Sequence, residues 1–210
     1  MKTILVLLLA TFLLNTSAAE NKYEQAMGKA VEKLNQATML DDFIEAANTF
    51  ERISNMEQKE WLPLYYAAFS QIIVSYQEQD LTKRDPILDK AQQFLDKAFK
   101  IAPNESELFA LQAFLYPSRI VVDPMARGME YMGIMNQALE NAIQQNPENP
   151  RSYYLRAITT LNMPENFGGG AAVAKPIFEK AQAKFDVFQP KSAIHPNWGK
   201  EQNEMELSKL

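Results

Sequence analysis

The chain has 210 residues, of which 47% are hydrophobic and 22% are charged, a balance that is ordinary for a globular protein and argues against disorder. The net charge of -5 argues against a nucleic-acid-binding protein, because a phosphate backbone requires a basic surface. The sequence has no cysteine, which excludes disulfides, thiol catalysis and thiolate metal sites. We also expect no bacterial lipoprotein anchor, which needs a cysteine at the cleavage site.

Residues 1–19 have the three parts of a cleavable signal peptide. Lys2 supplies the positive n-region, residues 4–14 form an apolar run, and residues 17–19 offer small side chains for cleavage before Glu20. The run is too short to span a bilayer, and no later segment is apolar enough to do so. The alternative interpretation is a buried N-terminal helix. We expect a secreted or periplasmic protein without a membrane span.

Apolar residues then recur at three- and four-residue spacing, and no stretch alternates with period two, which predicts an all-α protein. Asn149 before Pro150 is typical of an N-cap followed by proline at the first helical position, and Asp123 before Pro124 follows the same rule. These helices are expected to form antiparallel hairpins. Their expected ranges are 22–37, 41–56, 60–78, 85–101, 105–117, 124–145, 150–162 and 171–186, with a short tail helix after Trp198.

A repeat becomes visible when the second helices of the expected hairpins are aligned. Four sets of residues share intervals of four, three and five positions: Ala91-Leu95-Ala98-Pro103, Met135-Leu139-Ala142-Pro147, Ala46-Phe50-Ile53-Gln58 and, more loosely, Ala174-Phe178-Ala181-Asp186. Intervals of four and three keep the first three side chains on one helix face, where small residues allow neighbouring helices to approach closely. Such periodic contact positions indicate stacked units that cannot bury their faces alone.

The pattern Ala91-x3-Leu95-x2-Ala98-x4-Pro103 resembles the second-helix half of the tetratricopeptide (TPR) repeat. First-helix halves are matched in part by Phe109-x3-Ala113-x2-Tyr116, Tyr153-x3-Ala157 and, more weakly, Leu64-x3-Ala68. The terminal part, residues 164–199, resembles small exported repeat proteins of Gram-negative bacteria, including the Bacteroidetes type. The resemblance implies a short TPR-like α-solenoid of stacked antiparallel hairpins over residues 20–210, with a capping segment at residues 187–210.

The interval from Pro103 to Pro147 is longer than the family's period of about 34 residues. We expect the extra length in loops between first and second helices, at residues 77–85, 116–124 and 162–170. Corresponding loops of a stacked array emerge along one edge, so these three loops form a candidate functional rim.

The third loop contains Phe167, Gly168, Gly169 and Gly170 directly before a helix. The favoured interpretation is a flexible turn that lets Phe167 fold back on the core. The alternative is an anion site, because backbone N–H groups at a helix start can bind a carboxylate or phosphate.

In TPR proteins the first helices line a groove that receives an extended peptide or another ligand. Transferred to this sequence, that register implies a set of binding residues that includes aromatic residues and arginine, which are enriched at the hot spots of binding interfaces. For each aromatic residue, the alternative is that it packs inside the array. The implied binding residues are Tyr65, Phe69, Ile72, Phe114, Arg151, Tyr154 and Ile158. Adjacent tyrosines on a helix point about 100° apart, so one of Tyr65 and Tyr66 and one of Tyr153 and Tyr154 is expected at the surface or in the groove.

Nothing in the sequence indicates an enzyme. His195 is the only histidine, it lies in a loop-like His195-Pro196-Asn197 stretch, and no G-x-S-x-G element accompanies it. We therefore expect no catalytic residue, no metal site and no cofactor, with His195 at the surface or packed by the tail.

The sequence leaves two functional hypotheses open. The first is an exported binding or scaffold module whose groove takes a protein or peptide partner. The alternative is a repeat protein that binds a solute or small molecule and accompanies an envelope transport system.

Overall fold

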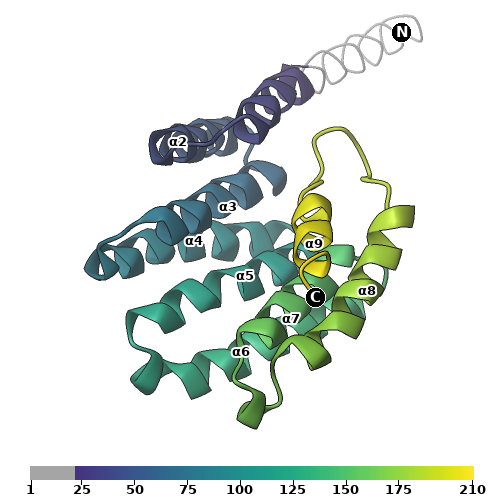
Figure 1. The fold of residues 1–210 in the computed structure, drawn as a ribbon. Helices are drawn as coiled ribbons and strands as arrows, with labels where there is room; N and C mark the ends of the chain where they lie inside the picture. Colours follow the sequence, from purple (N-terminus) through teal and green to yellow (C-terminus); the bar gives the residue numbers. More distant parts are fainter. Residues whose placement is uncertain (1–21) are drawn as a thin grey trace, which may run out of the picture.

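The computed structural model of the protein describes residues 22–210, which form a stack of antiparallel helices with no β-strand among them (Figure 1). The expected signal peptide lies outside these residues. A helical segment at 22–35 is followed by α2 (Leu40–Met56), α3 (Leu62–Gln77), α4 (Leu81–Ile101), α5 (Ser106–Val122), α6 (Pro124–Gln145), α7 (Pro150–Asn162), the short 3₁₀ helix η1 (Glu165–Phe167), α8 (Ala171–Val187) and α9 (Lys200–Leu207). The predicted all-α fold of stacked helices is confirmed. Within the described part of the chain, no helix has both the length and the apolar character needed to cross a bilayer.

Local capping sets the helix starts that the sequence predicts. Asp123 accepts a hydrogen bond from the backbone N–H of Ala126 at 3.1 Å, and Asn149 accepts one from Arg151 at 3.1 Å. Pro124 and Pro150 occupy the first helical positions of α6 and α7, where a missing N–H costs nothing. Both helices have the predicted bounds, because these signals lie within a few residues of the boundary.

The prediction of a long loop is wrong at two of the three positions, residues 77–85 and 116–124. Helix α4 begins at Leu81, and α5 continues through Pro117 to Val122, so that only Asp123 separates α5 from α6. The end of α5 is held by packing: Ser118 is buried and accepts a hydrogen bond from Ser75 of α3 at 3.0 Å. The repeat is therefore longer than a TPR because its helices are longer, and only the loop between α7 and α8 remains.

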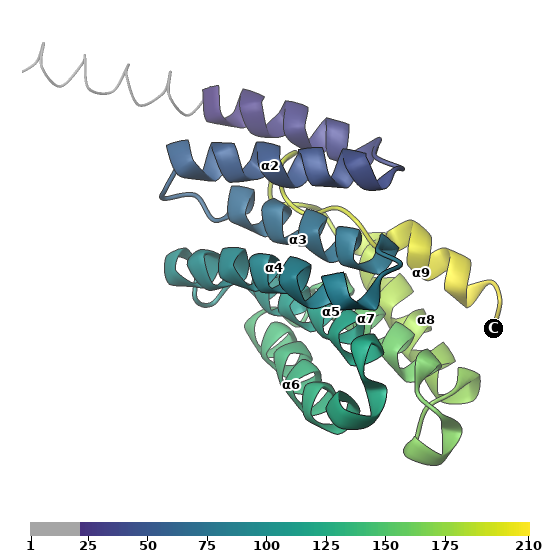
Figure 2. The same ribbon diagram turned by 90° about the vertical axis from the view of Figure 1, so that its left-hand side faces the viewer.

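The residues that the sequence repeat aligns lie at the contacts between neighbouring helices. Every first, second and third member of the four sets is buried: Ala46, Phe50, Ile53, Ala91, Leu95, Ala98, Met135, Leu139, Ala142, Ala174, Phe178 and Ala181. Consecutive pairs, α3 with α4, α5 with α6 and α7 with α8, pack along their lengths (Figure 2). The hydrophobic core thus runs between the helices through the whole stack.

We expect Ala98→Leu and Ala142→Leu each to destabilise the protein by about 1–3 kcal/mol, because the larger side chain overpacks a contact between helices. Both alanines are fully buried, whereas Ala183 on α8 is exposed and Ala183→Leu serves as the control. Thermal unfolding of the three variants measures the difference. Unchanged melting temperatures for both buried variants would contradict the repeat register.

Most of the central helix α3 is buried, which overturns the expectation for its tyrosine pair. Tyr66 stacks on Phe50 with ring centroids 5.0 Å apart, and its hydroxyl donates to the carbonyl of Ile194 at 3.0 Å. Tyr65 is also fully buried. The expectation that one of the two would be at the surface is wrong, because the C-terminal segment covers α3. For the second pair it is confirmed, since Tyr153 is buried and Tyr154 is partly exposed.

Candidate functional site

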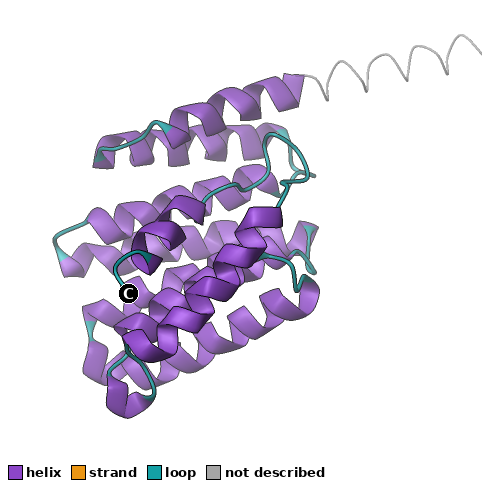
Figure 3. Cartoon of the chain, turned by 45° about the vertical axis from the view of Figure 1, so that its right-hand side comes forward, coloured by secondary structure: helices purple, strands orange, loops and turns teal. Residues whose placement is uncertain are grey.

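The C-terminal segment folds back over the face that α3, α5 and α7 present, which we call the inner face. After α8 the chain runs through residues 188–199, and α9 then packs against α8 (Figure 3). The segment is attached to this face by the hydrogen bond from Tyr66 to Ile194 and by an ion pair between Lys191 Nζ and Glu105 Oε2 at 3.0 Å. The inner face is thus shared between the helical array and its own C-terminal segment.

Trp198 lies at the centre of a set of aromatic rings on the inner face. Its ring centroid is 5.3 Å from that of Phe69 of α3, 5.5 Å from that of Phe114 of α5 and 6.5 Å from that of Tyr154 of α7. Tyr76 extends the set, with its centroid 5.2 Å from that of Phe114. All five residues are partly exposed, and we call them the inner aromatic cluster.

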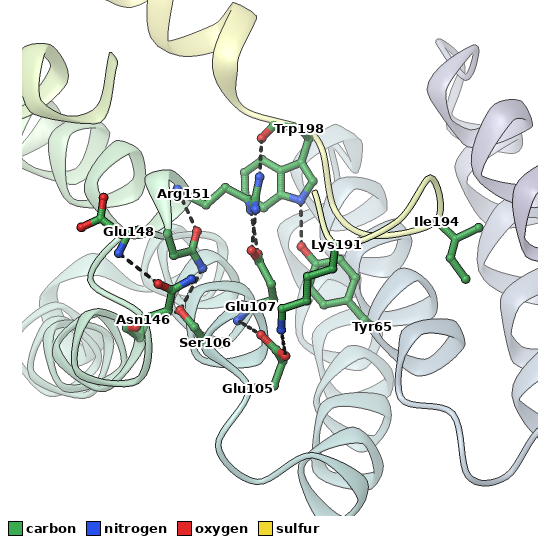
Figure 4. Close-up of polar contacts among 12 residues, drawn as sticks. Tyr65, Glu105, Ser106, Glu107, Asn146, Glu148, Arg151, Lys191, Ile194 and Trp198 are labelled. Carbon is green, nitrogen blue, oxygen red and sulfur yellow. Dashed lines mark hydrogen bonds and ion pairs between the residues drawn. The ribbon is translucent and has the colours of Figure 1, made fainter. Parts of the chain in front are cut away.

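Beneath this cluster, Tyr65 and Arg151 hold Trp198 in place (Figure 4). The Trp198 indole Nε1 donates to the Tyr65 hydroxyl at 2.8 Å, and Arg151 Nη1 donates to the Trp198 carbonyl at 3.4 Å. Arg151 is 0% exposed and forms a two-pronged pair with Glu107, in which Nε donates to Oε2 at 2.6 Å and Nη2 donates to Oε1. The guanidinium also lies 4.5 Å from the ring centroid of Phe188. The backbone of Trp198 is therefore bonded to a buried ion pair.

The hydroxyl groups of the inner face are neutral phenols at neutral pH. Burial raises the pKa of Tyr154 to about 12, and the Glu206 carboxylate adds to that rise. Burial also raises the pKa of Tyr65 well above its ordinary value, with a further contribution from Glu107. The hydroxyl of Tyr76 donates to the carbonyl of Phe114 at 2.9 Å, whereas that of Tyr154 has no hydrogen-bond partner among residues 22–210. Tyr154 is thus the cluster hydroxyl that remains free to meet a ligand.

The structure separates the sequence-predicted site residues into two groups. Phe69, Phe114 and Tyr154 converge on the inner face, and Ile158 is partly buried beside Tyr154. Tyr65, Ile72 and Arg151 are fully buried and present no side-chain surface to a ligand. Trp198 was missed as a site residue, because its partners come from three helices far away in the sequence. The only local signal was a large aromatic residue in a tail that also contains Phe188 and Ile194.

The backbone N–H groups of the three glycines before α8 are bonded within the protein, so these glycines do not bind an anion. The N–H of Gly168 donates to Glu165 at 2.9 Å, that of Gly169 to Pro164 at 3.2 Å and that of Gly170 to Thr160 at 2.9 Å. A Cβ on Gly169 would lie 2.0 Å from the Met163 carbonyl oxygen, so this position requires glycine.

Phe167, which precedes these glycines, is 72% exposed. The expectation that it folds back on the core is therefore wrong. The turn itself is present as predicted, with Gly168 and Gly170 at positive φ angles that favour glycine.

A second concave feature lies on the outer side of the array, between α4 and α6. This outer cleft has a volume of about 440 Å³. Its floor and walls are mainly apolar and its edges carry amide groups; the lining residues are Phe99, Phe109, Gln112, Gly133, Ile134, Gln137, Ala138 and Asn141. Phe109 and Gln112 lie on the side of α5 that faces away from Phe114, so the outer cleft and the inner aromatic cluster are separate.

His195 packs in the C-terminal segment, as the sequence analysis expects. Its ring centroid is 6.0 Å from that of Trp61, and its Nδ1 lies 2.8 Å from the Ser192 hydroxyl. Burial, together with Lys191, lowers the pKa of His195, so the ring is neutral at neutral pH. No group of three or more His, Cys, Asp or Glu side chains within residues 22–210 is placed to hold a metal ion.

Comparisons with known proteins give one informative similarity. No protein-family model matches the chain, and no curated protein matches its sequence. Among solved structures, the chain is similar to the HusA haemophore from Porphyromonas gingivalis, with a TM-score of 0.81 and 29% sequence identity over 89% of this chain and 92% of that chain. This similarity fits the resemblance to exported Bacteroidetes proteins and agrees with a non-enzymatic binding protein, whereas membership of the TPR family is not confirmed.

Proposed function

We propose that the protein is an exported carrier that binds a tetrapyrrole such as haem on the inner aromatic cluster. Its mature chain would begin at Glu20, after cleavage of the signal peptide. The observation that carries this proposal is Trp198, which is held at the centre of partly exposed rings in a fold similar to that of a haemophore. The proposal adopts the small-molecule hypothesis and adds a chemical class of ligand.

The geometry of the rings suits a flat aromatic macrocycle. Trp198 is inclined by 29° to Phe114 and by 38° to Phe69, and the two phenylalanines are inclined by 29° to each other. Three rings with similar orientations offer faces and edges against which a planar ligand can stack. Each such ring contact contributes about 0.5–1.5 kcal/mol beyond the apolar area that it buries.

The polar groups around the cluster would orient a bound ligand. The neutral Tyr154 phenol can donate a hydrogen bond to a ligand. Arg151 is buried and already paired with Glu107, so it supports the cluster and does not bind the carboxylates of the ligand. The residues that would hold the ligand are therefore Phe69, Phe114, Tyr154 and Trp198.

An extended peptide is less compatible with this face. Lys191, Ile194 and Trp198 of the C-terminal segment already bond to the helices that would line a peptide groove. A peptide would have to displace these contacts, whereas a compact ligand needs only the exposed sides of the rings. The protein-partner hypothesis is thus ranked second.

Titration of the mature chain (residues 20–210) with haemin and with metal-free protoporphyrin tests the proposal. We expect saturable quenching of tryptophan fluorescence and a shift of the porphyrin absorption band. The double variant Phe69→Ala/Phe114→Ala is expected to bind at least tenfold more weakly, which corresponds to about 1.4 kcal/mol or more. Phe109→Ala, which removes a ring from the outer cleft, is the matched control and should bind like the wild type.

Each outcome of the titration has a defined meaning. Loss of binding in Phe109→Ala, with the inner double variant unaffected, would move the site to the outer cleft. No saturable binding of either porphyrin to the wild type would overturn the proposal. A comparison of the two porphyrins then shows whether the iron contributes to affinity.

A further inference from the structure

The cations of the inner face differ in whether the protein already pairs them. A tetrapyrrole such as haem carries carboxylate side chains, and a carboxylate near an apolar surface is stabilised by a cation that donates hydrogen bonds to it. Helix α3, at the centre of the inner face, contains no lysine or arginine. A cation for the ligand must therefore come from the neighbouring elements.

The cations of α5, α7 and residues 188–210 are all engaged in ion pairs. Each lysine and arginine of these three segments has a carboxylate partner within the protein. The pairs are Arg119 with Asp85 and Asp89, Arg151 with Glu107, Arg156 with Glu140, Lys191 with Glu105, Lys200 with Asp186 and Lys209 with Glu206. A ligand carboxylate would have to compete with these internal partners.

Arg84, in the first turn of α4, has no such partner. Its side chain turns back to the end of α3, where Nε donates to the backbone carbonyl of Glu78 at 3.1 Å and Nη2 donates to the same oxygen at 2.9 Å. No carboxylate of residues 22–210 forms an ion pair with it. Because a guanidinium has five N–H donors, the bonds to Glu78 leave donors available for a further acceptor.

The acidic side chains nearest to Arg84 in the sequence are bonded elsewhere. Glu78 Oε1 accepts a hydrogen bond from the backbone N–H of Asp80 at 2.9 Å, and the Asp80 carboxylate caps the start of α4. Asp85 pairs with Arg127 at 2.8 Å. The partly buried guanidinium of Arg84 is thus held in place by a neutral carbonyl group, and its charge is not compensated by an ion pair.

Arg84 lies next to the inner aromatic cluster, beyond Tyr76. Tyr76 precedes Glu78 by two residues, and its ring centroid is 5.2 Å from that of Phe114, which in turn stacks on Trp198 at 5.5 Å. Burial raises the pKa of Tyr76, and the positive charge of Arg84 opposes that rise, as expected for neighbouring groups. A planar ligand that covers Trp198 and Phe114 and extends over Tyr76 therefore approaches Arg84 with its edge.

From this placement we propose that Arg84 binds a carboxylate of the ligand and so fixes the orientation of the ligand on the inner aromatic cluster. The inference rests on the tetrapyrrole proposal and deepens it to a tetrapyrrole with free carboxylates. The planar guanidinium matches the geometry of a carboxylate, which makes the contact directional as well as electrostatic. An esterified ligand cannot form this ion pair, so preference for the free acid is the measurable consequence.

Titration with protoporphyrin and with its dimethyl ester, both in the same detergent, tests this inference. The proteins compared are the mature wild type, Arg84→Gln and the control Arg52→Gln. Glutamine at position 84 keeps an N–H donor for the Glu78 carbonyl but removes the charge. Arg52 is a matched control, because it also lacks an ion pair but lies exposed on α2, away from the inner aromatic cluster.

We expect the wild type and Arg52→Gln to bind the free acid at least fivefold more tightly than the ester. Arg84→Gln should bind the free acid at least fivefold more weakly than the wild type and the ester within twofold of it. The ester thus reports whether the aromatic site is intact, because a merely structural role of Arg84 would weaken the binding of both porphyrins equally.

The remaining outcomes separate this inference from the tetrapyrrole proposal. Equal wild-type affinities for acid and ester, or unchanged binding of the acid by Arg84→Gln, would overturn the role of Arg84 and leave the tetrapyrrole proposal standing. The same holds if both porphyrins bind Arg84→Gln equally weakly, or if Arg52→Gln loses as much affinity as Arg84→Gln. A wild type that binds neither porphyrin would overturn both proposals.

Discussion

Replacing Arg151 with methionine is expected to destabilise the protein by about 3–5 kcal/mol, because the Glu107 carboxylate is then left buried without its partner. The side chain of Arg151 is 0% exposed and that of Glu107 is 10% exposed. Burial lowers the pKa of Arg151, but the Glu107 carboxylate outweighs burial and the net pKa is above its ordinary value, so Arg151 is charged in the folded protein. A loss of this size should lower the melting temperature by roughly 10 °C.

Arg156→Met is the matched control, because Arg156 lies on the same helix and pairs with Glu140, whose side chain is 63% exposed. Removing that surface pair should change the free energy of unfolding by less than about 1 kcal/mol. The double variant Arg151→Met/Glu107→Leu should recover at least half of the loss, because it leaves no buried charge. Similar melting temperatures for Arg151→Met and Arg156→Met would contradict the role assigned to the buried pair.

Trp198→Ala is expected to destabilise the protein by about 2–4 kcal/mol and to release the C-terminal segment from the inner face. The substitution removes ring contacts with Phe69, Phe114 and Tyr154 and leaves the buried Tyr65 hydroxyl without its indole donor. It also removes the ring on which the proposed tetrapyrrole stacks, so affinity should fall with stability. Thermal unfolding and limited proteolysis of residues 188–210 measure the two structural effects.

Two milder variants separate the ring contacts from the hydrogen bond. Trp198→Phe and Tyr65→Phe both lose the bond between Trp198 and Tyr65 but keep an aromatic ring at each position, so each should cost about 1 kcal/mol. Protease resistance of the C-terminal segment should be close to wild type in both. If Trp198→Ala were no more sensitive than Tyr65→Phe, Trp198 would not be the residue that attaches this segment.

The proposed site could be predicted from the sequence only in part. Phe69, Phe114 and Tyr154 follow from the register that the resemblance to TPR proteins implies for the first helices. Trp198 does not follow, since its bond to Tyr65 spans 133 positions and no periodic pattern includes it. Arg151 was predicted to bind a ligand, yet it pairs with Glu107, which lies 44 positions away.

The fold shows the same division between local and distant causes. The sequence by itself determined the all-α class, the capped starts of α6 and α7 and the contact face that includes Ala98 and Ala142, because capping and periodicity act within a few turns of one helix. Only the tertiary structure decided that α5 continues through Pro117, where packing outweighs the cost of a proline inside a helix. It also decided that Tyr65 and Tyr66 are both buried, because the covering C-terminal segment is held by contacts between residues that are far apart in the chain.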